Sequence, residues 1–415
     1  MAANVEDLRQ VDVADVYKGD RLAGTLERSG SEVVFQYGAD YVADPRTPQV
    51  AWAVPKDGPP ARGTGDSVPP FFAGLLPEGA RLSALVAGTK TSADDHLTLL
   101  LAVGNDTIGD VRVVPQGMAP VEPAVAFDDR DMSTLDLAAL FVGVTGQNTL
   151  EYDTAALPGV QPKVSAAMVS APLRAATGPA ILKLNPDRYP QLVENERFFL
   201  SMARDCGIEV PNHRLVHDGH GRAGLLVSRF DREVAGDIVR LAQEDACQVL
   251  DVYPGSKYRL KTEDVVARLG QAVLAGGGSR PLAVLRLFEL VAFSYLIGNG
   301  DLHGKNFSIG RRPGGRWDVT PAYDLICTQP YLSWRDPMAL TLYGRANRLT
   351  RSHLLAAGER LGLTERAVTA RLDRMCDKAG SWVDRVEEIG LDAKATRQLE
   401  GMLVARLAEL AKAPA

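Results

Sequence analysis

The sequence lacks the features that mark several specialised classes of protein. Its cysteines lie far apart, so no CxxC pair spells a zinc ribbon or a dithiol redox motif; they are Cys206, Cys247, Cys327 and Cys376. No stretch reaches the ~18 consecutive apolar residues of a membrane-spanning helix, and the first residues carry neither the basic region nor the apolar stretch of a secretion signal. We therefore expect a cytoplasmic protein with reduced thiols and no membrane partner.

An excess of positive charge is also missing. The chain has 46 lysines and arginines against 52 aspartates and glutamates, a formal net charge of −6. It therefore has no general cationic surface that could hold nucleic acid by neutralising phosphates, and any DNA contact should be local or made through a partner. The composition is otherwise that of a folded protein, and 415 residues favour two or three packed subdomains.

The first part of the chain is predicted to be an α+β unit. Residues 11–41 alternate between apolar and polar side chains, with glycine-containing turns between the runs, which indicates a β-meander. Residues 92–95 supply a helix cap before the apolar residues 97–103. Residues 115–126 are rich in proline, alanine and valine, and they are either a linker or a surface loop inside one unit.

Strand and helix patterns alternate in the middle of the chain. Residues 180–184 and 224–230 are predicted strands and residues 192–205 a predicted helix, which indicates an α/β core. Residues 282–297 are nearly all apolar and long enough for a buried helix. Leucines then recur at helical spacing on one face, so the last ~80 residues should be helical; they are Leu399, Leu403, Leu407 and Leu410.

A dense cluster of polar residues directly follows the apolar helix. Asp301 and Asn306 have the D-x-x-x-x-N spacing with which protein kinases place a carboxylate beside the substrate hydroxyl and an amide oxygen on magnesium. Asp324 follows a second hydrophobic segment, where another metal-binding carboxylate is expected. The alternative interpretation is a polar loop that is merely capped by Asn and Asp side chains.

A lysine in a predicted strand matches the same chemistry. Lys183 lies in the apolar strand 180–184, and Glu196 follows on the next predicted helix. A buried lysine needs a counter-charge, and a helix carboxylate would both neutralise it and direct its ammonium toward nucleotide phosphates. The alternative is a surface lysine with a solvated glutamate.

Three further segments carry weaker patterns. Residues 157–163 form a short turn with one glycine, whose backbone amides could hold phosphates. Residues 225–232 resemble a strand that leads into a kinase hinge, where Asp231 would either accept from a ribose hydroxyl or pair with a neighbouring arginine. Residues 243–245 are expected to begin a helix and to have no catalytic part.

These blocks, in their order along nearly the whole chain, resemble the HipA-type serine/threonine protein kinases, the toxins of bacterial toxin–antitoxin pairs. The resemblance rests on VYKGDRLAG at 16–24, FFAGLLPEG at 71–79, residues 159–163, 189–196, 228–232 and 243–248, LIGNGDLHGKNF at 296–307, and PAYD at 321–324. It implies an α+β fold with a two-lobed protein-kinase-like core, a β-rich N-terminal domain and an all-helical C-terminal region. The expected units are an N-terminal domain at 1–123, a nucleotide-binding lobe at 124–280 and a helical lobe at 281–415.

The resemblance also implies ATP and Mg²⁺ as cofactors and assigns roles to residues. Asp301 is then the catalytic base, Asn306 and Asp324 are the magnesium ligands, and Lys183 is the nucleotide-phosphate lysine. The other positions implied to contact the nucleotide are Pro158, Gly159, Val160, Gln161, Pro162, Lys163, Ser228, Arg229, Phe230, Asp231, His303, Gly304, Lys305 and Tyr323.

One position departs from the family pattern. Members commonly autophosphorylate a serine about three residues before the glycine of the phosphate loop, and this silences the enzyme. Ala156 occupies that position here, and the nearest hydroxyls are on Thr154 and Ser165. Inhibition by self-phosphorylation is therefore either lost or moved to another residue.

The resemblance implies partners as well. The family is held by a small helix-turn-helix HipB-like antitoxin that binds the operator of its own gene pair, so operator DNA would be reached mainly through the antitoxin. The expected substrate is a cytoplasmic protein linked to translation, such as an aminoacyl-tRNA synthetase. Two alternatives remain: a small-molecule phosphotransferase of the aminoglycoside or choline type, whose loop resembles residues 300–306, and a catalytically silent co-repressor.

Overall fold

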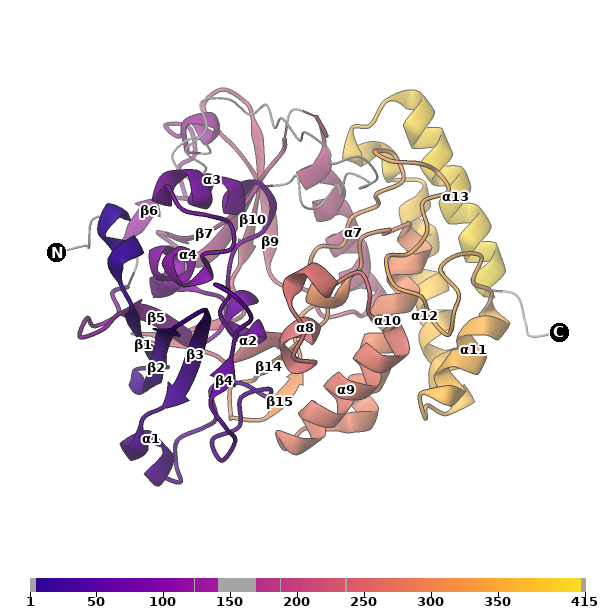
Figure 1. Cartoon of the computed structure of the whole chain (residues 1–415). Coiled ribbons are helices and arrows are strands. Elements are labelled where there is room, and N and C mark those ends of the chain that lie inside the picture. Colours follow the sequence, from indigo (N-terminus) through magenta and orange to yellow (C-terminus); the bar gives the residue numbers. More distant parts are fainter. Residues whose placement is uncertain (1–4, 123, 141–168, 187, 236, 412–415) are drawn as a thin grey trace.

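The computed structural model describes residues 5–122, 124–140, 169–186, 188–235 and 237–411 (Figure 1). Residues 154–168, which include Ala156 and the predicted phosphate loop, lie outside these ranges. Strands β1 to β5 are Val13–Lys18, Arg21–Ser29, Glu32–Tyr37, Ala61–Arg62 and Val111–Pro115. Strands β6 to β10 are Val125–Phe127, Val169–Ala175, Gly178–Leu184, His213–His217 and Ala223–Ser228, and β11 to β15 are Arg232–Ala235, Asp237–Arg240, Gln243–Asp245, Ser308–Arg311 and Trp317–Val319.

The α-helices of the described chain lie between and after these strands. Helices α1 to α4 are Ala39–Ala43, Pro70–Ala73, Gly79–Thr89 and His96–Val103, and α7 to α10 are Leu192–Cys206, Ala246–Val249, Thr262–Ala275 and Arg280–Ile297. Helices α11 to α13 are Arg351–Arg360, Glu365–Val383 and Ala393–Ala411. No helix in the described ranges is both long and apolar enough to cross a membrane.

The N-terminal sheet has the strand order β4-β3-β2-β1-β5 and is antiparallel throughout. The predicted meander is confirmed, because β1, β2 and β3 pair in sequence through turns at Gly19 and Gly30, which both adopt positive φ. The predicted cap is confirmed too: the side chain of Asp95 accepts a hydrogen bond from the amide of Thr98 at the start of α4.

The second sheet, of order β6-β7-β8-β10-β9, forms the upper middle of the molecule in Figure 1. The strand predicted at 180–184 is β8, and it lies between β7 and β10. Helix α7 packs against this sheet and contributes the buried Phe198 and Phe199 to the main hydrophobic core. The register of β8 places Lys183 opposite Ser170 on one side and Leu225 on the other.

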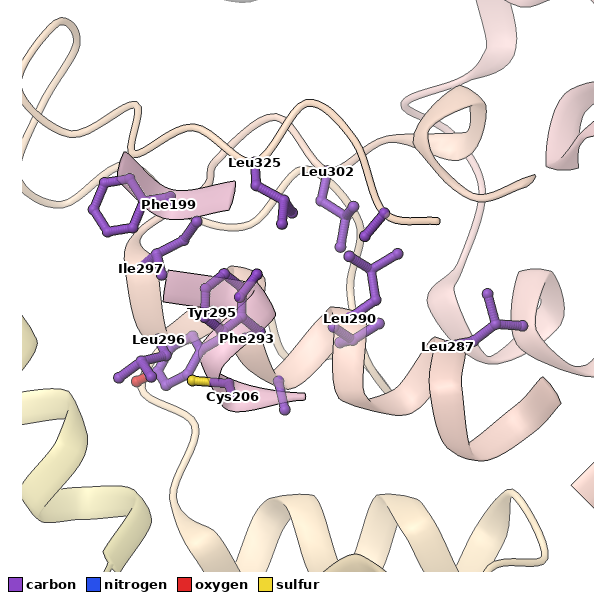
Figure 2. Packing of buried hydrophobic residues seen from close by; sticks show 14 of the residues in the cluster. Phe199, Cys206, Leu287, Leu290, Phe293, Tyr295, Leu296, Ile297, Leu302 and Leu325 are labelled. Carbon is purple, nitrogen blue, oxygen red and sulfur yellow. The ribbon is translucent and has the colours of Figure 1, made fainter. Parts of the chain in front are cut away.

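Helix α10 is the centre of the main core. Thirteen of its residues, from Ala283 to Ile297, are buried, as the apolar run predicted. Figure 2 shows Leu302 and Leu325, from the loops that carry Asp301 and Asp324, in the same cluster as Leu290 and Phe293 of this helix. The C-terminal region is helical as predicted, and α13 buries Leu399, Leu403 and Leu410.

The fold bears on two of the sequence interpretations. Glu122, in the segment between β5 and β6, pairs with Arg112 of β5 and with Arg240 of β12. The choice between a linker and a surface loop for this segment stays a prediction. The helix start predicted at residues 243–245 is present, because Asp245 is the N-cap of α8, the helix Ala246–Val249. The residues before the helix also form β13, which pairs with β14 and which the sequence did not indicate. The division of the chain at residues 123 and 280 stays a prediction.

Candidate nucleotide and phosphoryl-transfer site

A cavity of about 290 Å³ lies where the second sheet, the loops after α10 and the start of α3 meet. The described residues 5–122 are called the amino-terminal part below. The lining residues that they contribute are Gly74, Leu75, Pro77, Glu78, Arg81 and Ile108. From the second sheet and the hinge, they are Ser170, Pro172, Ile181, Lys183, Val227, Ser228, Arg229 and Phe230. From the remainder, they are Gln243, Asp245, Gln248, Lys257, His303, Lys305, Asn306, Ser308, Tyr323 and Asp324.

Lys183 is the charged centre of this cavity. It is 4% exposed, and its ammonium donates to Glu196 Oε1 at 2.6 Å and to Asp324 Oδ1. Burial works against the charge, but Asp324 and Glu196 outweigh it and raise the pKa of Lys183 above its ordinary value. Burial raises the pKa of Glu196, and Lys183 opposes that shift. The predicted lysine–glutamate pair is thus confirmed, and the surface interpretation is wrong.

Asp301 and Asn306 lie in the loop that follows α10. The helix ends at Ile297, and Gly298 caps it with a φ of +76°. The Asp301 amide donates to the side chain of Asn299 at 2.9 Å, and the Asn306 side-chain amide donates to the Asp301 carbonyl at 3.0 Å. The loop therefore closes on itself and holds the two predicted catalytic residues in one turn.

The carboxylate of Asp301 is covered in this conformation. It is 3% exposed and does not itself line the cavity, and the Tyr258 hydroxyl donates to its Oδ1 at 2.7 Å. Burial, together with the Asp301 charge, raises the pKa of Tyr258 above its ordinary value, so this hydroxyl keeps its proton. Tyr258 also packs edge-on against His303, with ring centroids 5.0 Å apart.

Lys305 and Tyr323 tie the loop to its surroundings. The Lys305 ammonium donates to Asp245 at 2.8 Å and to the Gly74 carbonyl at 2.9 Å. Burial opposes the charge on Lys305, but Asp245 raises its pKa above the ordinary value. The Tyr323 hydroxyl lies 2.5 Å from the Ser308 hydroxyl and donates to the Lys305 carbonyl at 2.7 Å. Both predicted residues line the cavity, but Lys305 is already paired.

The hinge lies at the end of β10. The Ser228 amide donates to the Asn212 carbonyl and the Arg229 amide to the Pro179 carbonyl, so neither amide is available to a base. Phe230 lines the cavity with its ring 5.9 Å from that of Tyr323. These two rings therefore form an apolar wall suited to a flat heterocycle.

Asp231 and Gly304 do not line the cavity. Asp231 is 4% exposed and accepts from Arg229, Arg232 and the Gly109 amide. Burial would raise its pKa, but the two arginines lower it to about 2. Of the two interpretations offered for Asp231, the geometry favours the ion pair over a ribose contact. Gly304 is buried where an added Cβ would lie 2.6 Å from Leu260.

Sequence reasoning missed the contribution of the amino-terminal part to this cavity. The block at 71–79 was recognised without a role, yet Gly74 and Glu78 line the cavity, and Glu78 pairs with Lys257 at 2.7 Å. The side-chain amide of Gln248 donates to the Phe71 carbonyl at 3.1 Å. The same side chain passes so close to Gly74 that a Cβ added there would lie 2.7 Å from it. Gly74, Pro77 and Gly79 were the available signal that the backbone of this segment lies close to another part of the chain.

The side chains expected to bind magnesium offer donor atoms of the kind that this ion prefers. Asp324 and Asn306 both line the cavity and offer a carboxylate and an amide oxygen, the hard donors that Mg²⁺ prefers alongside substrate phosphates and water. Asp324 adopts a φ of +54°, which is uncommon for a residue other than glycine. Among the described residues, no group of three or more His, Cys, Asp or Glu side chains could hold a metal ion. The two oxygen donors fit a weakly held Mg²⁺.

Comparison with known proteins covers both halves of the chain. Residues 14–114 match the family model of the HipA N-terminal domain, and residues 155–383 match that of the HipA-like C-terminal domain. "Putative kinase Y4mE" of Sinorhizobium fredii is 28% identical over 92% of this chain and 94% of its own. The serine/threonine-protein kinase toxin HipA of Shewanella oneidensis is 27% identical over 87% of this chain and 86% of its own.

The fold agrees with these matches. A solved structure of the Shewanella oneidensis HipA, HipB and operator DNA complex superposes with a TM-score of 0.74, at 23% identity and covering 96% of each chain. That likeness shows a shared α+β kinase-like fold. Because the C-terminal match alone spans more than half of the residues and the N-terminal match precedes it in the expected order, the chain belongs to the HipA family of kinase-like proteins.

Proposed function

We propose that this protein is an ATP- and Mg²⁺-dependent serine/threonine protein kinase that acts as the growth-arresting toxin of a toxin–antitoxin pair. The observation that carries the proposal is a cavity lined by Lys183, Asp324 and Asn306, in which Lys183 pairs with Asp324 and with the buried Glu196. Asp301 is joined to this group by the hydrogen bond from the Asn306 side chain to its carbonyl. Phosphoryl transfer needs chiefly positioning and charge neutralisation, and these residue types supply both.

Each residue has a distinct role in this proposal. Lys183, kept charged by Glu196, binds the nucleotide's phosphates, and Asp324 and Asn306 hold Mg²⁺. When bound, the ion neutralises phosphate charge. Asp301 orients the acceptor hydroxyl and takes its proton once that hydroxyl has replaced the hydroxyl of Tyr258. Phe230 and Tyr323 pack against the base.

Partners are proposed from the family and from charge. A structural relative is a complex of HipA with HipB and operator DNA, which supports a HipB-like helix-turn-helix antitoxin as partner. The net charge of −6 suits DNA contact through that antitoxin and joint repression of the operon. The protein substrate is proposed to be a cytoplasmic component linked to translation, such as an aminoacyl-tRNA synthetase, and regulation by autophosphorylation would need a residue other than Ala156.

Phosphate transfer from ATP tests the catalytic proposal. The native chain with ATP and Mg²⁺ should transfer phosphate to itself or to a protein acceptor, detected by mass spectrometry, and Asp301→Asn should reduce the rate about 10²- to 10⁴-fold. Asp318→Asn is the matched control, since Asp318 pairs with Arg286 outside the cavity. ATP binding without transfer by the native chain under any condition would instead indicate a silent binding protein.

A further inference from the structure

Arg81 is a cation that the amino-terminal part contributes to the cavity. It lies in the first turn of α3, the helix Gly79–Thr89, and lines the same cavity as Lys183 and Asp324. Its side chain is half-buried. Helix α3 also contacts β7, the strand whose Ser170 and Pro172 line the same cavity. Arg81 is therefore part of the cavity wall and not of the outer surface.

The other cationic side chains of this wall are already neutralised. Each is held by a carboxylate: Lys183 by Glu196 at 2.6 Å, Lys257 by Glu78 at 2.7 Å, Lys305 by Asp245 at 2.8 Å, and Arg229 by Asp231 at 2.7 Å. Arg81 makes no ion pair with a carboxylate anywhere in the part of the chain that the structure describes. Of the described lysines and arginines that line the cavity, Arg81 alone keeps its positive charge unpaired.

The surroundings of Arg81 favour an anionic ligand. Burial lowers the pKa of Arg81, the nearby Asp106 opposes that shift, and Arg229 adds to it. A guanidinium stays charged under such conditions, so a ligand anion would relieve the unfavourable desolvation. Glu78, which precedes α3, makes no side-chain cap and binds Lys257 instead. The positive end of the helix dipole thus adds to the charge of Arg81 at this wall.

We propose that Arg81 binds a phosphate group of the nucleotide, so that the amino-terminal part supplies one cation of the nucleotide site. The inference rests on the proposed function, because it takes the ligand of this cavity to be ATP. A planar guanidinium presents a fixed fork of donors that matches two oxygens of one phosphate, whereas a lysine ammonium acts as a point charge without that fixed geometry. The nucleotide is then bound by cations from both parts of the chain, Lys183 of the second sheet and Arg81 of α3.

Binding of a nucleotide series tests this role. Affinities for ATP, ADP and adenosine are measured by calorimetry with the native chain, Arg81→Gln, Arg81→Lys and the control Arg62→Gln, which changes an exposed arginine that pairs with Glu32 on the N-terminal sheet. Arg81→Gln should lose about tenfold to hundredfold in affinity for ATP and ADP and keep its affinity for adenosine. Arg81→Lys should lose less, and Arg62→Gln should match the native chain.

The outcomes separate this inference from the proposed function. If Arg81→Gln loses as much affinity for adenosine as for ATP, or loses no affinity for either, the phosphate contact is overturned and the kinase proposal stays intact. A native chain that binds no ATP would overturn the proposed function itself. If Arg81→Gln fails to fold, Arg81→Lys decides, because a lysine that binds ATP, ADP and adenosine as the native chain does would contradict the two-oxygen contact.

Discussion

At the scale of single residues, the charged side chains buried at this site are accompanied by side chains of opposite charge. Lys183 is nearly inaccessible to water, and two carboxylates keep it charged. A buried ion pair contributes little net stability, but the loss of one partner leaves an uncompensated charge. The Lys183 cluster is therefore explained by the chemistry it supports more than by stability. Asp231 follows the same rule away from the cavity wall that it was expected to join, since it is buried together with its partners Arg229 and Arg232.

Glu244 gives a pH prediction at this scale. It is 2% exposed and accepts from the Trp52 amide, and burial raises its pKa to about 8 from 4.5 although Lys18 opposes the shift. Because the folded state favours the protonated form, this contribution to stability is present below pH 4.5 and is lost as the pH rises through 8. The free energy of unfolding should therefore fall as the pH rises from about 4.5 to about 8, which includes the range from about pH 6 to about pH 8.

The variant Glu244→Gln measures that contribution. Glutamine keeps a carbonyl oxygen that accepts from the Trp52 amide, but it cannot ionise. The pH-dependent decrease in the free energy of unfolding should therefore be smaller in this variant by about 2 kcal/mol, as measured by urea unfolding at each pH. Glu32→Gln, an exposed carboxylate paired with Arg62, serves as the control and should leave the pH profile unchanged. An identical profile for native and Glu244→Gln chains would show that Glu244 ionises normally.

At the scale of elements, the two loops of the proposed phosphoryl-transfer site are positioned by the core beneath them. Leu302 and Leu325 follow Asp301 and Asp324 and are buried against α10 (Figure 2). Each functional side chain is thus one residue away from an anchored apolar side chain. Close packing of this kind leaves little freedom for the loop, which is what phosphoryl transfer by positioning requires.

The N-terminal sheet offers a prediction about strand packing. An added Cβ on Gly24 of β2 would lie 2.1 Å from the backbone oxygen of Gln36 on β3, whereas on Gly38 nothing lies closer than 3.8 Å. Gly24→Ala should therefore destabilise the protein by about 1–3 kcal/mol, because the obstacle is backbone that cannot move aside. Gly38→Ala, measured in the same urea titration, should be close to neutral. Equal stability of the two variants would contradict the packing.

At the scale of the whole molecule, the amino-terminal part and the kinase-like core share a buried network of charges. Asp106 accepts from Arg229 at 2.9 Å, from Arg232 at 3.0 Å and from Arg240 at 3.2 Å. Gly109 also donates to Asp231. In Figure 1 the amino-terminal elements lie beside the second sheet, with α2 next to α8. This contact places the start of α3 in the wall of the cavity.

Removing the charge of Asp106 tests this network. Asp106→Asn leaves three buried arginines with one fewer counter-charge, so the free energy of unfolding should fall by about 3–5 kcal/mol. Asp128→Asn removes a carboxylate that pairs with the exposed Arg130 and should have almost no effect. Urea unfolding measures both. A loss in Asp106→Asn no larger than that in Asp128→Asn would mean that the network does not hold the two parts together.

Local patterns in the sequence predicted the elements and the chemistry that depends on nearby residues. The β-meander, the buried helix α10 and the pairing of Lys183 with Glu196 follow from periodicity and from short separations along the chain. The loop from Asp301 to Asn306 is another such case, because one turn contains both residues. Gln243–Asp245 is a mixed case: Asp245 caps α8 as the local signal predicted, but the pairing of β13 with β14 has no local signal.

Only the tertiary structure decided which distant groups meet. Lys305 and Gly74 are 231 residues apart, and Arg229 and Asp106 are 123 apart, so no spacing rule could connect them. The choice between ion pair and ribose contact for Asp231 depended on whether Arg229 and Arg232 turn toward it. That Arg81 makes no ion pair with any carboxylate in the described ranges is likewise visible only in the tertiary structure, since electrostatic pairing depends on distance in space and not along the chain.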